Sequence, residues 1–153
     1  NEHQKTDADT IIFNKVTLIQ KLMKYLKKAN SPSTKNRSYY YFLVANCYLN
    51  MSEYGNSWYM KRYCWSINHV GQGLVDDDDY FKCKRAIYYY NKAKYYSRNK
   101  KFAALCLRMV ARCTSYTTST NQTFDKLKKE YPDDYDELTN NCLSFEDYFK
   151  LHD

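Results

Sequence analysis

The chain has 153 residues, 44% of them hydrophobic, which is long enough for one domain with a core and too short for two comfortable ones. Only three glycines and two prolines occur, which argues against a β-sandwich or barrel and favours long helices joined by polar loops. The net charge is +7, but residues 80–124 carry ten cations and no acid, whereas residues 125–153 are acidic. The basic segment therefore either binds an acidic partner or is neutralised within the fold, and we favour neutralisation.

The first predicted helix covers residues 10–29 and is rich in lysine. Its lysines fall mainly away from one apolar face, so the helix is amphipathic. Such a helix either packs on the core or lies on a membrane surface or in a partner's groove, and we favour packing on the core. The apolar residues that share this face are Ile12, Val16, Ile19, Met23 and Leu26.

A second helix is predicted over residues 38–51, and a third begins at Ser57. The loop that follows, 68–79, ends in four consecutive aspartates. These carboxylates lack the alternating spacing of a calcium-binding loop. We therefore expect them to cap the next helix and to place negative charge at its N-terminus.

Four more helices are predicted at residues 80–97, 102–113, 123–130 and 133–141. No segment of the chain predicts a strand with any clarity, and no run of 18 apolar residues predicts a transmembrane helix. The predicted fold class is therefore all-α, with about seven helices in antiparallel hairpins.

The six cysteines do not predict a metal site. None forms a CxxC pair, and the histidines are far from them in sequence, so neither zinc nor any other metal is expected. Five of the six lie in apolar helical patterns, which favours mostly reduced, buried thiols over a disulfide framework.

Three groups of residues have the spacing of a helical repeat. The first group, from Tyr41 to Tyr48, is followed by Ser52-Glu53-Tyr54, which suits a turn. The second group places the small residues Ala86 and Ala93 on either side of the Tyr90 ring, and the third group begins at Phe102. Together the first two groups resemble the first and second helices of a tetratricopeptide repeat, and the third group resembles the start of a further first helix. The seam of stacked helices implied by this resemblance consists of Tyr41, Val44, Ala45, Tyr48, Ala86, Tyr90, Ala93, Phe102 and Leu105.

The resemblance implies a short α-solenoid similar to tetratricopeptide-repeat domains. The interval from Tyr54 to Ala86 is longer than that family allows, so an inserted helix and loop are expected there. The whole chain, 1–153, is then a single helical domain. Its parts are a flexible N-terminus (1–9), the first helices (10–54), the insertion (55–80), a helix pair similar to the repeat (81–113) and acidic C-terminal helices (123–153).

No GxGxxG, GxxxxGK[ST], HExxH or GxSxG motif occurs, and no Cys/His pair has catalytic spacing. We therefore expect no catalytic residue, no cofactor and no enzymatic activity. The predicted function is a non-catalytic interaction or scaffolding module that binds a protein or peptide as part of a longer protein. The resemblance further implies a bacterial exported or envelope-associated protein, although no targeting segment in the chain indicates a compartment.

The candidate binding residues are aromatic or cationic. Those in the insertion either plug the concave side of the stack or contact a ligand there, and the tryptophans would equally suit a carbohydrate. The other two candidates, Tyr88 and Tyr95, lie on the helix predicted over residues 80–97, away from the seam. The alternative function is a basic nucleic-acid-binding domain that uses the Lys, Arg and Tyr residues of 82–112. The candidates are Trp58, Tyr59, Arg62, Trp65, Tyr88 and Tyr95.

The prediction for the cysteines can be checked by counting thiols. Under denaturing, non-reducing conditions the protein should react with one equivalent of thiol reagent for each of its six cysteines. A lower count in freshly purified protein would indicate a fold built on disulfides.

Overall fold

The computed structural model describes residues 14–57, 77–118 and 122–140, which contain seven helices and no strand, so the predicted all-α class is confirmed. Each described helix is too short or too polar to span a bilayer. The helices are α1 (Lys15–Asn30), α2 (Arg37–Asn50), α3 (Asp77–Lys82), α4 (Lys84–Tyr96), α5 (Lys100–Ser115), α6 (Gln122–Glu130) and α7 (Pro132–Asn140).

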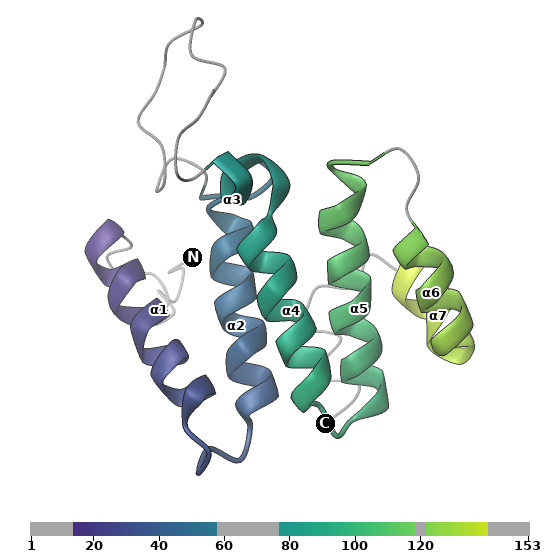
Figure 1. Cartoon of the computed structure of the whole chain (residues 1–153), viewed down its shortest axis with the longest axis horizontal. Helices are drawn as coiled ribbons and strands as arrows, with labels where there is room; N and C mark the ends of the chain where they lie inside the picture. The colour runs from purple at the N-terminus through teal and green to yellow at the C-terminus, as the bar shows by residue number, and fades with distance from the viewer. Residues whose placement is uncertain (1–13, 58–76, 119–121, 141–153) are drawn as a thin grey trace, which may run out of the picture.

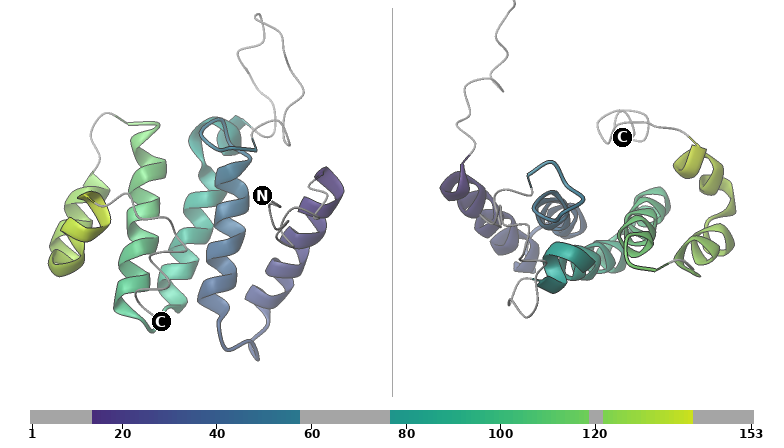
Figure 2. Two further views of the ribbon diagram at one scale, coloured as in Figure 1. Left: turned by 180° about the vertical axis from the view of Figure 1, so that it is seen from behind. Right: turned by 90° about the horizontal axis from the view of Figure 1, so that it is seen from above.

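The long helices stand side by side in one row, and each runs antiparallel to the next (Figure 1). The row begins with α1 and continues through α2, α4 and α5 to the pair α6 and α7, with the short α3 at one end of α2 and α4. Each helix packs mainly on its neighbours in the row. Seen from above, the row is curved (Figure 2).

The core lies where α4 packs between α2 and α5. Ala86 and Ala93 of α4 are fully buried and present only methyl groups to the neighbouring helices. Larger rings fill the remaining space, and the Phe42 ring lies 5.4 Å from that of Tyr90 and 5.3 Å from that of Phe102. Small residues beside large ones let the helices approach closely without leaving voids.

The N-terminus of α1 is fixed by a capping box. The Asn14 side chain accepts a hydrogen bond from the backbone N–H of Thr17, and the Thr17 hydroxyl accepts one from the backbone N–H of Asn14. These bonds satisfy donors that have no partner inside the helix. Predicted helical residues before 14 lie outside the described part of the chain.

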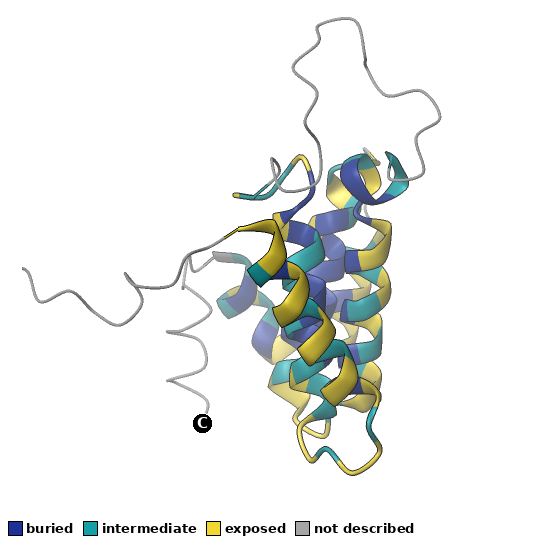
Figure 3. Cartoon of the chain, turned by 90° about the vertical axis from the view of Figure 1, so that its left-hand side faces the viewer, coloured by how far each residue is buried: buried dark blue, intermediate teal, exposed yellow. Residues whose placement is uncertain are grey.

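The predicted core face of α1 is wrong. Val16, Ile19 and Met23 are exposed by 63%, 55% and 65%. The outward side of α1 is mostly exposed (Figure 3). Leu18 and Ala29 are buried instead, on the side that packs against α2. Both faces of α1 are apolar at helical spacing, so periodicity alone cannot decide which one faces the core.

The helix predicted over residues 80–97 is broken into α3 and α4. The break is at Cys83, whose φ of 51° is left-handed and whose side chain is buried. A non-glycine residue in this conformation costs roughly 1–2 kcal/mol. The packing of the buried Cys83 side chain against the core offsets this cost.

Cys83 occupies the N-cap position of α4 but makes no capping hydrogen bond, and Asp79 of α3 caps the helix in its place. One carboxylate oxygen of Asp79 accepts the backbone N–H of Arg85 at 2.9 Å, and the other accepts the Arg85 Nε at 2.9 Å. Asp78 pairs with Lys82 at 2.9 Å and Lys84 at 2.7 Å, and hydrogen bonds from these two lysines lower the pKa of Asp78 to about 2. These aspartates of α3 thus bind the start of α4.

The other helix ends lie close to their predicted positions. α5 is longer than predicted because the Asn99 side chain accepts the backbone N–H of Phe102, which starts the helix at Lys100. The third helix, predicted from Ser57, falls on residues 58–76, outside the described part of the chain.

Four cysteines are described, and all four are thiols rather than disulfides. Cys83, Cys106 and Cys113 are buried in the core, and Cys47 is half-buried. Burial raises the pKa of the Cys106 and Cys47 thiols, which keeps both protonated and unreactive at neutral pH.

The Asp79 cap can be tested by substitution. Asp79→Ala should lower the free energy of unfolding by about 1–2 kcal/mol, because the start of α4 loses its acceptor. Urea denaturation followed by circular dichroism measures the change. Asp78→Ala, which removes only exposed ion pairs, is the matched control and should have a smaller effect. Equal effects of the two substitutions would contradict the capping role.

Candidate functional site

Four tyrosine rings stack in a continuous series between α2 and α4. The Tyr41 ring lies 5.4 Å from that of Tyr96 and 6.2 Å from that of Tyr89, with interplanar angles of 18° and 20°. Tyr89 in turn stacks on Tyr48 at 5.6 Å and 7°. These contacts are of the stacked kind that stabilises aromatic pairs beyond their buried area.

Cations from both helices lie over the stacked rings. The guanidinium of Arg37 is 4.2 Å from the Tyr96 ring centre, and the Lys92 ammonium is 5.2 Å from that of Tyr41. The side chains of Arg37 and Lys92 are therefore attracted to neighbouring aromatic rings.

The most deeply buried phenols have hydrogen-bond partners. The Tyr90 hydroxyl donates to Oδ1 of Asn46 at 2.6 Å, and the Tyr41 hydroxyl donates to Oδ1 of Asn30 at 2.9 Å. Burial raises the pKa of Tyr90 well above its ordinary value, so its hydroxyl remains a donor. These two tyrosines serve the fold.

Tyr88 and Tyr95 are the most exposed tyrosines of α4, whereas Tyr96, which is 37% exposed, stacks on Tyr41. Tyr88 is 52% exposed and Tyr95 is 80% exposed. They are seven residues apart, which places them on one face about 10 Å apart along the helix axis. We call this pair the tyrosine strip. Lys92 lies beside it, with its ammonium 4.9 Å from the centre of the Tyr88 ring.

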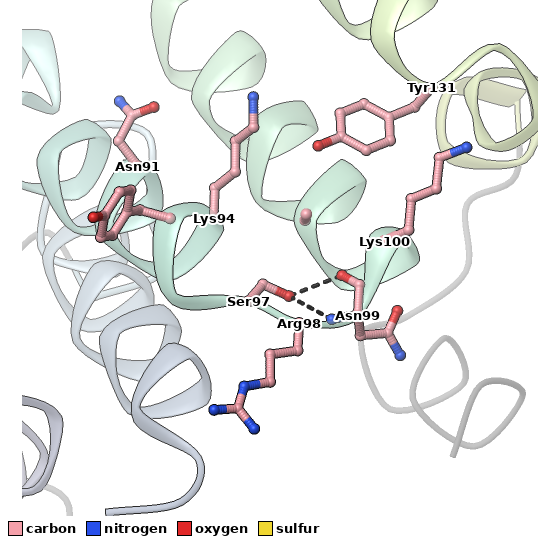
Figure 4. A pocket seen from close by; sticks show the side chains of 9 residues that line it. Asn91, Lys94, Ser97, Arg98, Asn99, Lys100 and Tyr131 are labelled. Carbon is pink, nitrogen blue, oxygen red and sulfur yellow. Dashed lines mark hydrogen bonds between the residues drawn. The ribbon is translucent and has the colours of Figure 1, made fainter. Parts of the chain in front are cut away.

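A pocket of about 410 Å³ lies at the C-terminal end of the tyrosine strip, where α4 turns into α5. In the close view, the Tyr131 ring, which extends from the junction of α6 and α7, lies between the side chains of Lys94 and Lys100 (Figure 4). We call this cavity the turn pocket and define it by Lys94, Tyr95, Arg98, Asn99, Lys100 and Tyr131.

The turn that forms the pocket is held by short hydrogen bonds. The Ser97 hydroxyl donates to the backbone carbonyl of Asn99 at 2.8 Å and accepts the Asn99 N–H at 3.2 Å (Figure 4). Lys94 forms an ion pair with Glu130 at 2.8 Å, which ties α4 to α6 and lowers the pKa of Glu130. The pocket is thus built by α4, α5, the fixed turn between them and Tyr131, which lies between α6 and α7.

The turn pocket suits an anionic group. Among the described residues, no acidic side chain lines it, and it presents three cations together with amide and phenol groups. Arg98 and Lys100 form no ion pair with any described residue, so both can meet an incoming carboxylate or phosphate.

Most of the other cations of residues 82–112 bind groups of the protein itself. Their partners are aspartates, aromatic rings, Glu130, the backbone carbonyl of Leu138 and the Tyr116 hydroxyl. The acidic segment after residue 124 therefore neutralises part of the basic one. The cations with such partners are Lys82, Lys84, Arg85, Lys92, Lys94, Arg108 and Arg112.

The structure places only part of the predicted site. Tyr88 and Tyr95 are exposed on α4, but the candidates in the insertion lie outside the described residues: Trp58, Tyr59, Arg62 and Trp65. The residues expected in the repeat seam are buried, except for Tyr48 and Phe102, which are half-buried. The sequence prediction did not include Tyr131 or Asn99, because no motif marks them and only tertiary packing brings Tyr131 to the pocket.

Within the described ranges, no three His, Cys, Asp or Glu side chains gather in a way that could hold a metal ion. No family model, no curated protein and no solved structure matches the chain. A function can therefore be inferred only from the surface of the molecule itself.

The tyrosine triplet 88–90 allows a sharp test of which rings serve the fold. Tyr90→Phe should lower the free energy of unfolding by about 1–2 kcal/mol, because it removes a buried hydrogen bond to Asn46. Tyr88→Phe is the matched control and should change it by less than about 0.5 kcal/mol. Urea denaturation measures both. A larger effect at Tyr88 would show that its hydroxyl has a structural role.

Proposed function

We propose that the chain is a non-catalytic interaction module that binds an acidic polypeptide along the tyrosine strip, with an acidic side chain in the turn pocket. The observation that carries this proposal is the exposure of Tyr88 and Tyr95, because the other tyrosines of α4 stack or pack. Tyrosine is enriched at protein interfaces, since it supplies a large contact area at little cost in conformational entropy.

The arrangement of the helices supports a repeat-type scaffold similar to tetratricopeptide-repeat domains. Successive helices are antiparallel, each packs mainly on its neighbours, and small residues of α4 and α5 face the packed interior. A stack of this kind presents a long surface to a ligand.

The charge of the turn pocket favours an acidic ligand. Arg98 and Lys100 supply cations at one end of the strip, and Asn99 and Tyr131 add polar groups nearby. The volume of about 410 Å³ lies in the ordinary range for binding pockets, so it can accept a side chain of the ligand. The strip then binds the neighbouring part of the ligand through ring contacts.

Nucleic-acid binding is the second candidate, because Lys92 and two exposed rings could contact phosphates and stack on bases. It is less favoured. At least eight of the ten cations of residues 82–112 are engaged by other groups, which leaves few for phosphate contacts.

The test compares two probes by fluorescence anisotropy: a flexible labelled peptide of alternating Glu and Tyr, and a single-stranded DNA oligonucleotide. The peptide should bind the natural chain, and Arg98→Glu with Lys100→Glu should weaken it by about tenfold or more, since both cations are reversed. Tyr95→Ala should also weaken it, because the most exposed ring of the strip is lost.

Lys15→Glu with Lys21→Glu makes the same change in net charge on α1, away from the pocket, and should leave peptide binding nearly unchanged. If DNA binds more tightly than the peptide and its affinity falls steeply between about 50 and 200 mM salt, the nucleic-acid alternative is correct. If the peptide does not bind, or binds the pocket variant equally well, the proposal is wrong.

A further inference from the structure

The outward face of α1 carries an apolar stripe that the described part of the fold does not cover. Val16, Ile19 and Met23 are 63%, 55% and 65% exposed, and we call these three residues the outer stripe. Their spacing of three and four residues, continued by the half-buried Leu26, is that of the a and d positions of a heptad. This is the spacing of a seam between two packed helices.

The outer stripe lies where another helix would extend the row. α2 packs against the opposite side of α1, through Leu18 and Ala29, and α1 is the first of the described helices in the row (Figure 1). Rows of stacked helices require a polar outer face on the terminal unit to remain soluble. The apolar outer face of α1 therefore indicates a docking surface rather than a finished end.

The charge of α1 indicates what docks there. The helix has five lysines and no acid. Lys27 projects close to the direction of Val16 and Met23, and Lys24 lies next to it around the axis, at 100° per residue. Neither lysine forms an ion pair with a described residue. A helix that fits this surface carries acids beside its own apolar seam.

We propose that the outer stripe of α1 binds an amphipathic helix of a partner protein, with acidic residues flanking the partner's apolar seam. A second copy of this chain fits poorly, because it would bring two lysine-rich helices together. A membrane surface also fits poorly, because the buried apolar residues Leu18 and Ala29 of α1 are packed on α2 and the outer stripe has only three residues and no aromatic ring. α2 lies between α1 and the helices that line the turn pocket, and the proposal does not depend on the function proposed above.

The test uses the whole chain and two synthetic helices of about three heptads. Both carry Leu at a and d, and one carries Glu at e and g where the other carries Lys. The natural chain should bind the Glu helix at least about tenfold more tightly than the Lys helix, as measured by isothermal titration calorimetry. Ile19→Gln with Met23→Gln should weaken binding of the Glu helix by about tenfold or more, because these side chains form the centre of the seam.

Charge reversal supplies the decisive variant. Lys24→Glu with Lys27→Glu should invert the preference, so that the Lys helix binds more tightly than the Glu helix. Arg98→Glu with Lys100→Glu makes the same change in net charge at the turn pocket and should not invert it. Circular dichroism and thermal melting confirm that each variant folds, as expected for exposed helical positions.

Three results would overturn the proposal. The first is failure of the natural chain to bind the Glu helix, or equal binding by the Ile19→Gln/Met23→Gln variant. The second is a dimer in light scattering that the same variant abolishes, which would assign the stripe to a second copy. The third is stripe-dependent binding to phosphatidylserine vesicles without binding to the Glu helix, which would assign it to a membrane surface.

Discussion

The rest of the structure depends on the packing of α4 between α2 and α5. Ala86 and Ala93 are fully buried on α4, and only their methyl groups separate it from its neighbours. Tyr90, on the same side, fills the interior with its ring and donates its hydroxyl to Asn46. Because this face is committed to the core, the orientation of every other side chain of α4 follows from it. The rings toward α2 stack, and those opposite the core remain in water.

The same packing explains which groups the cations of the basic segment, residues 80–124, contact. Cations of α4 lie next to rings of α2 and acids of α3 and α6, because the row places these groups around them. Lys92 lies over tyrosine rings, and Lys94 pairs with Glu130. What remains on the surface is a small set of tyrosines and cations near one turn. The surface left after packing is therefore more informative about function than the composition of the segment.

The two proposed surfaces differ in chemistry and position. The tyrosine strip and turn pocket combine polar rings with cations and suit an acidic segment of polypeptide. The outer stripe of α1 is aliphatic, follows heptad spacing and has lysines beside it, so it suits a helix. If both are used, the row of helices joins two partners, one on α1 and one on α4, with α2 between these helices (Figure 1). This is the arrangement expected of a scaffold.

The sequence by itself determined the helical class and most helix ends, because apolar periodicity and the scarcity of Gly and Pro act locally. It also identified Tyr88 and Tyr95 as outward-facing, since helical geometry fixes them relative to Ala86 and Ala93. Tertiary structure alone decided three matters. α1 has two apolar faces, and only the position of α2 buries Leu18 rather than Val16. The left-handed Cys83 depends on its buried contacts, and Tyr131 reaches the turn pocket only because α6 packs against α5 and pairs with α4. Each involves a contact between segments distant in the chain, which local patterns do not encode.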